Sequence, residues 1–132
     1  MTAGLRQRIE QRAGGRCGYC QAPAFICGYT FHLEHCIPKA AGGKSGESNL
    51  ALACASCNFK KSSHTHAMDP VSGAMQPVFH PVAQLWNSHF SLKGSKITGK
   101  TAVGRASVVL LDLNSLKRQE ARKVWRSTGL WP

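Results

Sequence analysis

The sequence predicts one small α+β domain, and three observations support this prediction. The chain has 132 residues, a length that usually corresponds to a single domain. Residues 3–13 have the apolar spacing of a helix, whereas residues 31–37 alternate from side to side as a strand does. The 13 glycines and 6 prolines indicate many turns. We therefore expect short helices and strands joined by tight connections.

The first part of the chain is predicted to form a helix followed by a turn. In the helix at residues 3–13, Leu5 and Ile9 lie four positions apart, and two glycines follow its end. Residues 16–20, RCGYC, are predicted to form a tight turn, and residues 21–30 a loop with some strand.

The strand at residues 31–37 carries a histidine on each of its faces. Because successive side chains of a strand point to opposite sides, His35 shares one face with Leu33. On the other face, His32 lies beside Glu34. The sequence therefore predicts an imidazole and a carboxylate next to each other in the chain but pointing apart.

A loop and a helix are expected after this strand. Residues 38–48, PKAAGGKSGES, are rich in glycine and serine and have no periodicity, which predicts a loop. Asn49 and Leu50 open the apolar stretch NLALACASC, and a helix is expected to continue through residues 58–62.

The second half is predicted to be a mixture of short strands and helix. Residues 75–80 and 88–92 are short strand candidates, and LKGSKITGK is predicted to be a basic hairpin. Residues 106–113, ASVVLLDL, are apolar and rich in β-branched side chains, which makes them the best strand candidate in the chain. Asn114 is expected to cap a final helix at residues 115–127.

The charge of the chain is strongly positive. The formal net charge is +11, and no acidic residue lies between Asp69 and Asp112. A small basic domain usually has a polyanion as its partner, most often nucleic acid, although a solvated basic surface is the simpler alternative. No apolar run approaches the ~20 residues of a membrane span, and the N-terminal segment lacks the apolar core of a secretory signal. We therefore expect a cytoplasmic protein without a membrane partner.

The cysteines predict a structural zinc site. Six cysteines are present, and four of them form two C-x-x-C pairs: Cys17 with Cys20, and Cys54 with Cys57. Each C-x-x-C turn directs two thiolates to one point, and two such turns complete a tetrahedral site with no open position. The alternatives are a redox dithiol and, in a secreted chain, disulfides. Cys27 and Cys36 lie outside the pattern and are expected in the interior.

One ordered series of residues resembles a known family. Between and around the cysteine pairs the chain contains CGYC, then HLEHCIPKAAGG, then NLALACASCNFKK. This series is similar to the HNH endonuclease family, with its carboxylate–histidine pair, proline, glycine pair, Asn-Leu pair and C-x-x-C followed by a polar ligand and a lysine. The matching positions are Glu34, His35, Pro38, Gly42, Gly43, Asn49, Leu50, Asn58 and Lys61. The text DPVSGAMQPVFHPVAQLWNSHF also resembles the C-terminal extension of compact bacterial members.

The resemblance implies the ββα-metal fold and a division of the chain. Residues 16–66 would form a zinc-clamped ββα core of two antiparallel strands, a long loop and a helix packed across them. Residues 67–132 would form a C-terminal β/α extension. Residues 1–132 would together make a single HNH nuclease domain.

The resemblance also implies a role for each matching side chain. His35 would be the general base that activates water, and Glu34 with Asn58 would hold a catalytic divalent metal. Asn49 would tie the loop together and orient His35. His32, on the same face as Glu34, is either a further metal ligand or phosphate contact, or a partly exposed strand histidine. Glu34 stands where the family usually has aspartate, and Asn58 stands at its final histidine position.

Elementary chemistry supports these roles. Hydrolysis of a phosphodiester needs an attacking water, and imidazole is a base that works near neutral pH. It also needs the negative charge of the phosphoryl and leaving oxygens to be neutralised, which a divalent ion does. The oxygen donors of Glu34 and Asn58 suit a hard ion, so we expect Mg²⁺, with Mn²⁺ or another transition metal as alternatives.

Several lysines are predicted to contact the phosphate backbone. Lys60 and Lys61 lie next to Asn58, and Lys93, Lys96 and Lys100 lie on the predicted basic hairpin. We therefore expect nucleic acid as the substrate, with double-stranded DNA ahead of RNA. The alternative function is a zinc-stabilised nucleic-acid-binding protein that keeps the HNH fold without catalysis. Both a monomer and a dimer are compatible with the sequence.

Overall fold

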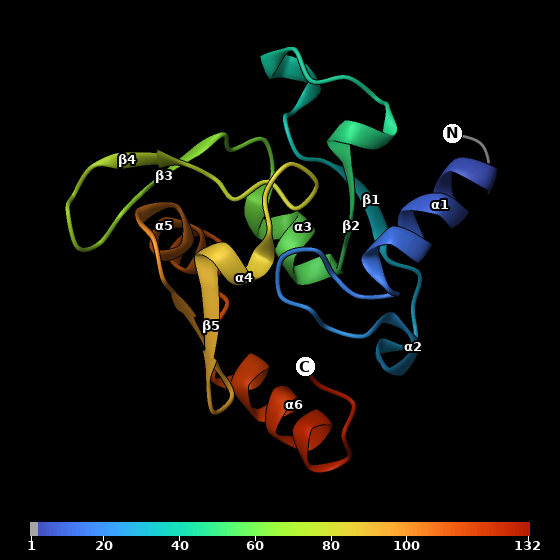
Figure 1. Cartoon of the computed structure of the whole chain (residues 1–132), viewed down its shortest axis with the longest axis vertical. Helices are drawn as coiled ribbons and strands as arrows, with labels where there is room; N and C mark the ends of the chain where they lie inside the picture. Colours follow the sequence, from blue (N-terminus) through green and yellow to red (C-terminus); the bar gives the residue numbers. More distant parts are fainter. Residues whose placement is uncertain (1–2) are drawn as a thin grey trace.

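Two antiparallel strands and a helix lie at the centre of the first half of the molecule (Figure 1). The structure is a computed structural model that describes residues 3–132. Strand β1 (His32–His35) pairs with β2 (Leu50–Ala53), and helix α3 (Ala55–Lys61) follows β2 directly. Helix α1 (Ala3–Ala13) packs against β2. The expected strand, loop and helix are therefore present in this order, and the α+β class is confirmed.

The register of this hairpin fixes the position of the site. His35 pairs with Leu50 and Glu34 pairs with Ala51. Both His35 and Glu34 therefore lie at the end of the hairpin where its long connection begins. That connection contains two short 3₁₀ turns, η1 (Lys39–Ala41) and η2 (Glu47–Asn49). All four residues of β2 are buried, whereas in β1 only Glu34 is buried and His32 is exposed. Strand β2 is thus the inner strand of the pair.

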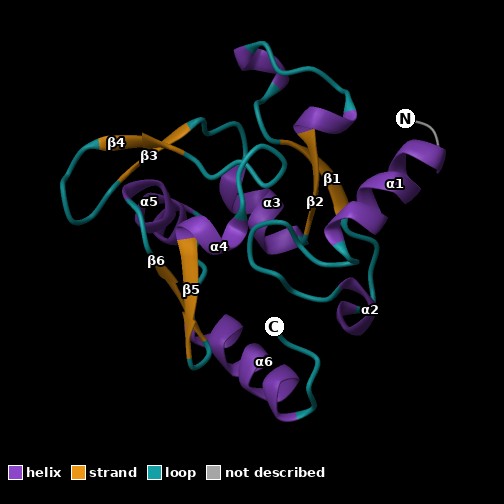
Figure 2. Ribbon diagram, in the orientation of Figure 1, coloured by secondary structure: helices purple, strands orange, loops and turns teal. Residues whose placement is uncertain are grey.

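Two further two-stranded ribbons form the second half (Figure 2). The elements are β3 (His66–Met68), β4 (Met75–Pro77), α4 (Trp86–His89), β5 (Phe90–Lys93), β6 (Lys96–Gly99), α5 (Ala102–Leu110) and α6 (Leu116–Ser127). Strand β3 pairs with β4, and β5 pairs with β6 in the predicted basic hairpin. Helix α5 packs against both ribbons. None of the helices in residues 3–132 is long and apolar enough to cross a bilayer.

The prediction of a strand at residues 106–113 is wrong, because these residues belong largely to helix α5. The Thr101 side chain accepts a hydrogen bond from Gly104 N and so caps the helix before the β-branched run begins. The buried positions Gly104, Ser107 and Leu111 then follow helical spacing. A Cβ at Gly104 would lie 2.1 Å from His89 O, so this glycine lets α5 approach the chain before β5. Tertiary packing therefore outweighs the local strand preference.

Two smaller predictions need correction. The final helix is capped by Ser115, whose side chain accepts from Arg118 N, and not by Asn114. Asn114 instead makes two hydrogen bonds to the backbone of Ile97 and so ties this segment to β6. Within residues 21–30, predicted as loop with some strand, the structure has a short helix, α2 (Ala24–Cys27).

One buried cluster connects the two halves of the chain. It includes Ile9 of α1, Leu52 of β2, Phe90 of β5 and Trp131 near the C-terminus. Since residues 16–66 and residues 67–132 share this core, we propose that they fold as a single domain.

Candidate functional site

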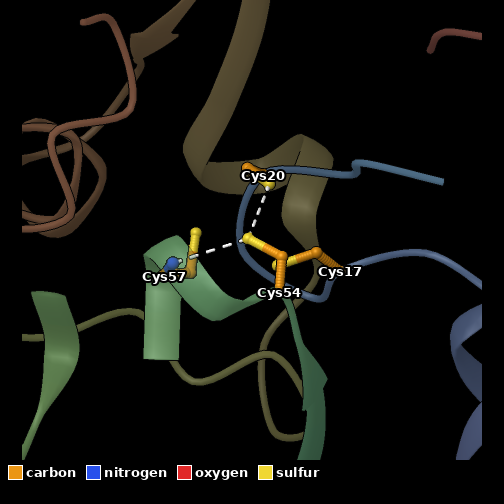
Figure 3. A group of neighbouring side chains, drawn as sticks. All are labelled: Cys17, Cys20, Cys54 and Cys57. Carbon is orange, nitrogen blue, oxygen red and sulfur yellow. Dashed lines mark hydrogen bonds between the residues drawn. The ribbon is translucent and has the colours of Figure 1, made fainter. Parts of the chain in front are cut away.

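The four cysteines of the C-x-x-C pairs converge on one buried point (Figure 3). One pair lies on the turn after α1, and the other at the start of α3. The four sulfurs lie within 4.8 Å of one another, and Cys20 Sγ is 3.7 Å from Cys54 Sγ. Zn–S bonds of ~2.3 Å place the sulfurs of a tetrahedral site about 3.8 Å apart. Donor type, burial and spacing therefore fit a structural zinc ion, and the predicted convergence is confirmed.

Arg118 of α6 lies against this thiol cluster. Its Nη2 is 2.9 Å from Cys57 Sγ, and its Nη1 donates to Leu111 O at 2.7 Å. The pKa of the Cys20 thiol lies well below its ordinary value. The hydrogen bond with Cys17 contributes most to this, hydrogen bonds with the other two cysteines contribute further, and the charge of Arg118 adds to the effect. Four thiolates carry more negative charge than one Zn²⁺ neutralises, and the guanidinium offsets part of the excess.

A second group of side chains lines one surface hollow. Glu34 and His35 of β1 and Asn58 of α3 all face this hollow of about 390 Å³. Lys39, at the start of the long connection, also lines it. Strand and helix therefore bring a carboxylate, an imidazole and an amide to one place, although Glu34 and His35 are neighbours on a strand.

The carboxylate of Glu34 is held on both of its oxygens. Lys61 Nζ lies 2.7 Å from Oε1, and Tyr19 OH donates to Oε2 at 2.6 Å. Glu34 is only 6% exposed. Burial raises the pKa of Tyr19 well above its ordinary value, and the neighbouring Cys36 and Glu34 raise it further. The phenol therefore stays a hydrogen-bond donor to the carboxylate.

Lys61 is itself buried, with 1% of its surface exposed. It also donates to His35 O at 3.2 Å. This position contradicts the prediction that Lys61 contacts nucleic acid, because its ammonium group is committed to Glu34 and the β1 backbone. Lys60, the preceding residue, is exposed and stays a candidate for phosphate contact.

His35 contacts the long connection through its ring. Its Nε2 lies 2.9 Å from Ser45 Oγ. A hydrogen bond of this kind limits rotation of the ring and fixes which nitrogen faces the hollow. His32, on the opposite face of β1, is exposed, as the simpler of its two interpretations predicts. A role for His32 at a metal stays a prediction.

Asn49 closes the long connection. Its Oδ1 accepts from Ile37 N at 2.8 Å, and its Nδ2 donates to Ile37 O and Lys44 O. It ties the loop as expected, but its bonds go to backbone groups, whereas the ring of His35 is held by Ser45. Gly43 permits this closure, since a Cβ there would lie 1.7 Å from Ile37 O.

The chemical type of the donor atoms around the hollow fits a divalent metal. A carboxylate has about four lone-pair sites, and Lys61 with Tyr19 use two of them. Asn58 adds an amide oxygen or nitrogen to the same hollow. Glu34 and Asn58 are thus the residues that would hold such an ion, through the lone pairs that Glu34 keeps free. Oxygen donors of this type favour Mg²⁺ or Mn²⁺.

The predicted basic hairpin presents its lysines to solvent. Lys93 and Lys96 are exposed and pair directly across the β5–β6 ribbon. Lys100 is exposed and donates to Asn87 O at 2.8 Å. Like charges opposite each other in a ribbon destabilise it unless an anion neutralises them. Arg122 of α6, by contrast, is buried and bonds to Ser95 O, so it is structural.

Sequence reasoning missed four residues of these two sites. Tyr19 and Arg118 act on groups that are distant in the chain, and no local pattern predicts these contacts. Ser45 and Lys39 lie in the glycine-rich connection, whose path the sequence does not specify. Tyr19 carries the one available signal, because it lies between two predicted zinc ligands.

Comparison with known proteins agrees with this geometry. Residues 17–64 match the HNH endonuclease family. The chain is similar to the Septu protein PtuB of Bacillus thuringiensis, with 24% identity over 116 residues, which cover 86% of this chain and 42% of that protein. The chain therefore spans less than half the length of this curated relative. No solved structure matches.

Residues 17–64 thus form an HNH endonuclease domain, and the resemblance seen in the sequence is confirmed. The match begins at the first zinc ligand and ends just after α3, so it contains the thiol cluster, the β1–β2 hairpin and the hollow lined by β1 and α3.

Proposed function

We propose that this chain is a metal-dependent endonuclease that hydrolyses phosphodiester bonds in DNA. The observation that supports this most directly is the hollow that Glu34, His35 and Asn58 share. A base and two oxygen donors that face one space are what hydrolysis of a phosphodiester requires.

Each of these residues has a distinct task in the proposed reaction. His35 takes the proton of the attacking water, and the contact of its Nε2 with Ser45 Oγ holds the ring in place. Glu34 and Asn58 hold the divalent ion, which, when bound, neutralises charge on the phosphoryl and leaving oxygens. Lys39 at the edge of the hollow binds a phosphate of the substrate.

Binding of the nucleic acid is proposed to be mainly electrostatic. The exposed lysine pair Lys93 and Lys96 and the neighbouring Lys100 offer positive charge, and the net charge of the chain is +11. Such contacts bind the backbone without reading bases, so affinity should fall steeply with salt. We propose weak sequence preference and double-stranded DNA as the first substrate to test.

The test is cleavage of supercoiled plasmid by zinc-loaded protein, with and without added Mg²⁺ or Mn²⁺. Leaving out the second metal, without adding a chelator, keeps the structural zinc in place. Matched single-stranded DNA and RNA substrates identify the substrate class. We expect nicked or linear plasmid with Mg²⁺ or Mn²⁺ and intact plasmid without them. Retained DNA binding without cleavage in any metal would favour the non-catalytic binder instead.

A further inference from the structure

Lys61 and Glu34 form a buried ion pair inside the candidate site. Lysine is among the side chains least often buried, because removing its charge from water is costly. Here the cost is offset by the carboxylate at 2.7 Å and by the backbone oxygen of His35. Lys61 is the last residue of α3, so this pair also joins the helix to β1.

Tyr19 completes the arrangement from the opposite side. It lies between the zinc ligands Cys17 and Cys20, and its hydroxyl donates to the second carboxylate oxygen of Glu34 at 2.6 Å. The carboxylate is therefore fixed by the zinc turn on one side and by α3 on the other. A side chain held on both oxygens has one orientation, and Glu34 lines the hollow.

We propose that Lys61 is the resident counter-ion of Glu34 and sets the affinity of the site for its divalent metal, with Tyr19 as the positioning residue of the carboxylate. This inference rests on the proposed function, since it takes the hollow as the metal site. A fixed ammonium in contact with a ligand oxygen repels a second cation and competes for the electron pairs of the carboxylate. Lys61 therefore lowers the affinity of the site for the metal below the value that the carboxylate would give without it.

The chain supplies a matched control for this proposal. Lys60 is the adjacent residue on α3, carries the same charge and is exposed. Lys60→Met therefore removes one positive charge at almost the same place without touching the Glu34 carboxylate. Any effect that depends only on net charge appears in both variants, whereas an effect of the ion pair appears in Lys61→Met alone.

The experiment measures binding of Mn²⁺ to zinc-loaded protein by calorimetry, without nucleic acid. Lys61→Met should bind Mn²⁺ about tenfold more tightly than wild type, because the competing cation is gone. Lys60→Met should bind as wild type does, and Glu34→Gln should lose the site. The unfolding temperature of Lys61→Met should fall without Mn²⁺ and recover when Mn²⁺ is added. A purely structural role for Lys61 predicts weaker binding instead.

The possible outcomes separate this inference from the proposed function. Mn²⁺ binding by wild type with equal or weaker binding by Lys61→Met would overturn the counter-ion role and leave the nuclease proposal standing. The absence of any Mn²⁺ binding in both proteins would overturn both. If Lys61→Met does not fold, the NMR signals of ¹⁵Nζ in wild-type protein test the counter-ion role instead. Mg²⁺ should shift the signal of Lys61 and leave that of Lys60 in place, and an unchanged Lys61 at Mg²⁺ saturation would contradict the proposal.

Discussion

The Arg118 guanidinium lies 2.9 Å from Cys57 Sγ, so a residue of the C-terminal helix contacts the thiol cluster that clamps the HNH domain. The same side chain donates to Leu111 O, just beyond α5. One arginine thus connects the zinc cluster, the end of α5 and the start of α6. Stability of the C-terminal part and retention of zinc should therefore depend on each other.

Replacing Arg118 should accelerate loss of zinc. In Arg118→Gln the thiolates lose a charge-assisted hydrogen bond worth roughly 1.5–3 kcal/mol, which corresponds to at least about tenfold faster release. Zinc transfer to a chromophoric chelator measures this rate. Lys117→Gln is the control, since Lys117 is exposed and carries the same charge one position earlier. Equal release rates for the two variants would contradict a role of Arg118 at the cluster.

Removing the Asn49 side chain should destabilise the long connection. Asn49→Ala leaves backbone groups of Ile37 and Lys44 without their partners, which should lower the free energy of unfolding by about 2–4 kcal/mol. Urea unfolding at a fixed zinc concentration measures it. The exposed Asn87 provides the control substitution to alanine. A loss no larger than that of Asn87→Ala would show that the loop does not depend on this clamp.

The ion pair of Asp69 with Arg105 should make stability depend on acid pH. Hydrogen bonds from Arg105, with further bonds from Ser72 and the Val71 amide, hold the pKa of Asp69 well below its ordinary value. A carboxyl group with a lowered pKa in the folded state stabilises the fold above its unfolded pKa of about 3.9, and this stabilisation is lost as the pH falls through the folded value.

The measurement compares wild type with Asp69→Asn at several pH values. Wild type should be the more stable protein at pH 7, and the difference should shrink below pH ~4. Using the difference removes the effect of zinc loss in acid, which both proteins share. A stability difference between the two proteins that stays constant down to the lowest pH would contradict a lowered pKa of Asp69 in the folded state.

Neutralising the basic hairpin should weaken DNA binding evenly across sequences. Lys93→Gln and Lys96→Gln should each reduce the slope of log affinity against log salt by about 0.9 if each contacts one phosphate. Binding to labelled duplexes at several salt concentrations measures this slope. Arg8→Gln on α1 serves as the charge control, since Arg8 pairs with Glu47. An unchanged slope in the lysine variants would place the DNA elsewhere on the surface.

The parts of the molecule that the sequence predicts correctly depend on local patterns. The alternation around His35 and the two C-x-x-C turns are set by spacing over a few residues, so strand β1 and the thiol cluster are visible without a structure. The same reasoning fails at residues 106–113, where a β-branched run lies in a helix. There the local cap at Thr101 and the close approach of Gly104 to His89 O favour the helix, and the second of these depends on packing between segments that the sequence pattern does not reveal.

The candidate site shows the same limit. The sequence identifies Glu34, His35 and Asn58, but it places Lys61 among the phosphate contacts, because a lysine next to Lys60 looks like part of a basic surface. Burial of Lys61 follows from its pairing with Glu34 across the helix–strand contact, which sequence spacing does not reveal. Ser45 and Tyr19 are missed for the same reason.

The most direct test of the central claim is the single-turnover cleavage rate of His35→Ala beside His64→Ala. His35 lines the hollow, whereas His64 is exposed beyond the end of α3. At saturating Mg²⁺ and with zinc content and DNA affinity matched to wild type, His35→Ala should cleave about 10²–10⁴ times more slowly, and His64→Ala should cleave as wild type does. Equal rates for wild type and His35→Ala would contradict the assignment of His35 as the base and, with it, the proposed catalytic centre.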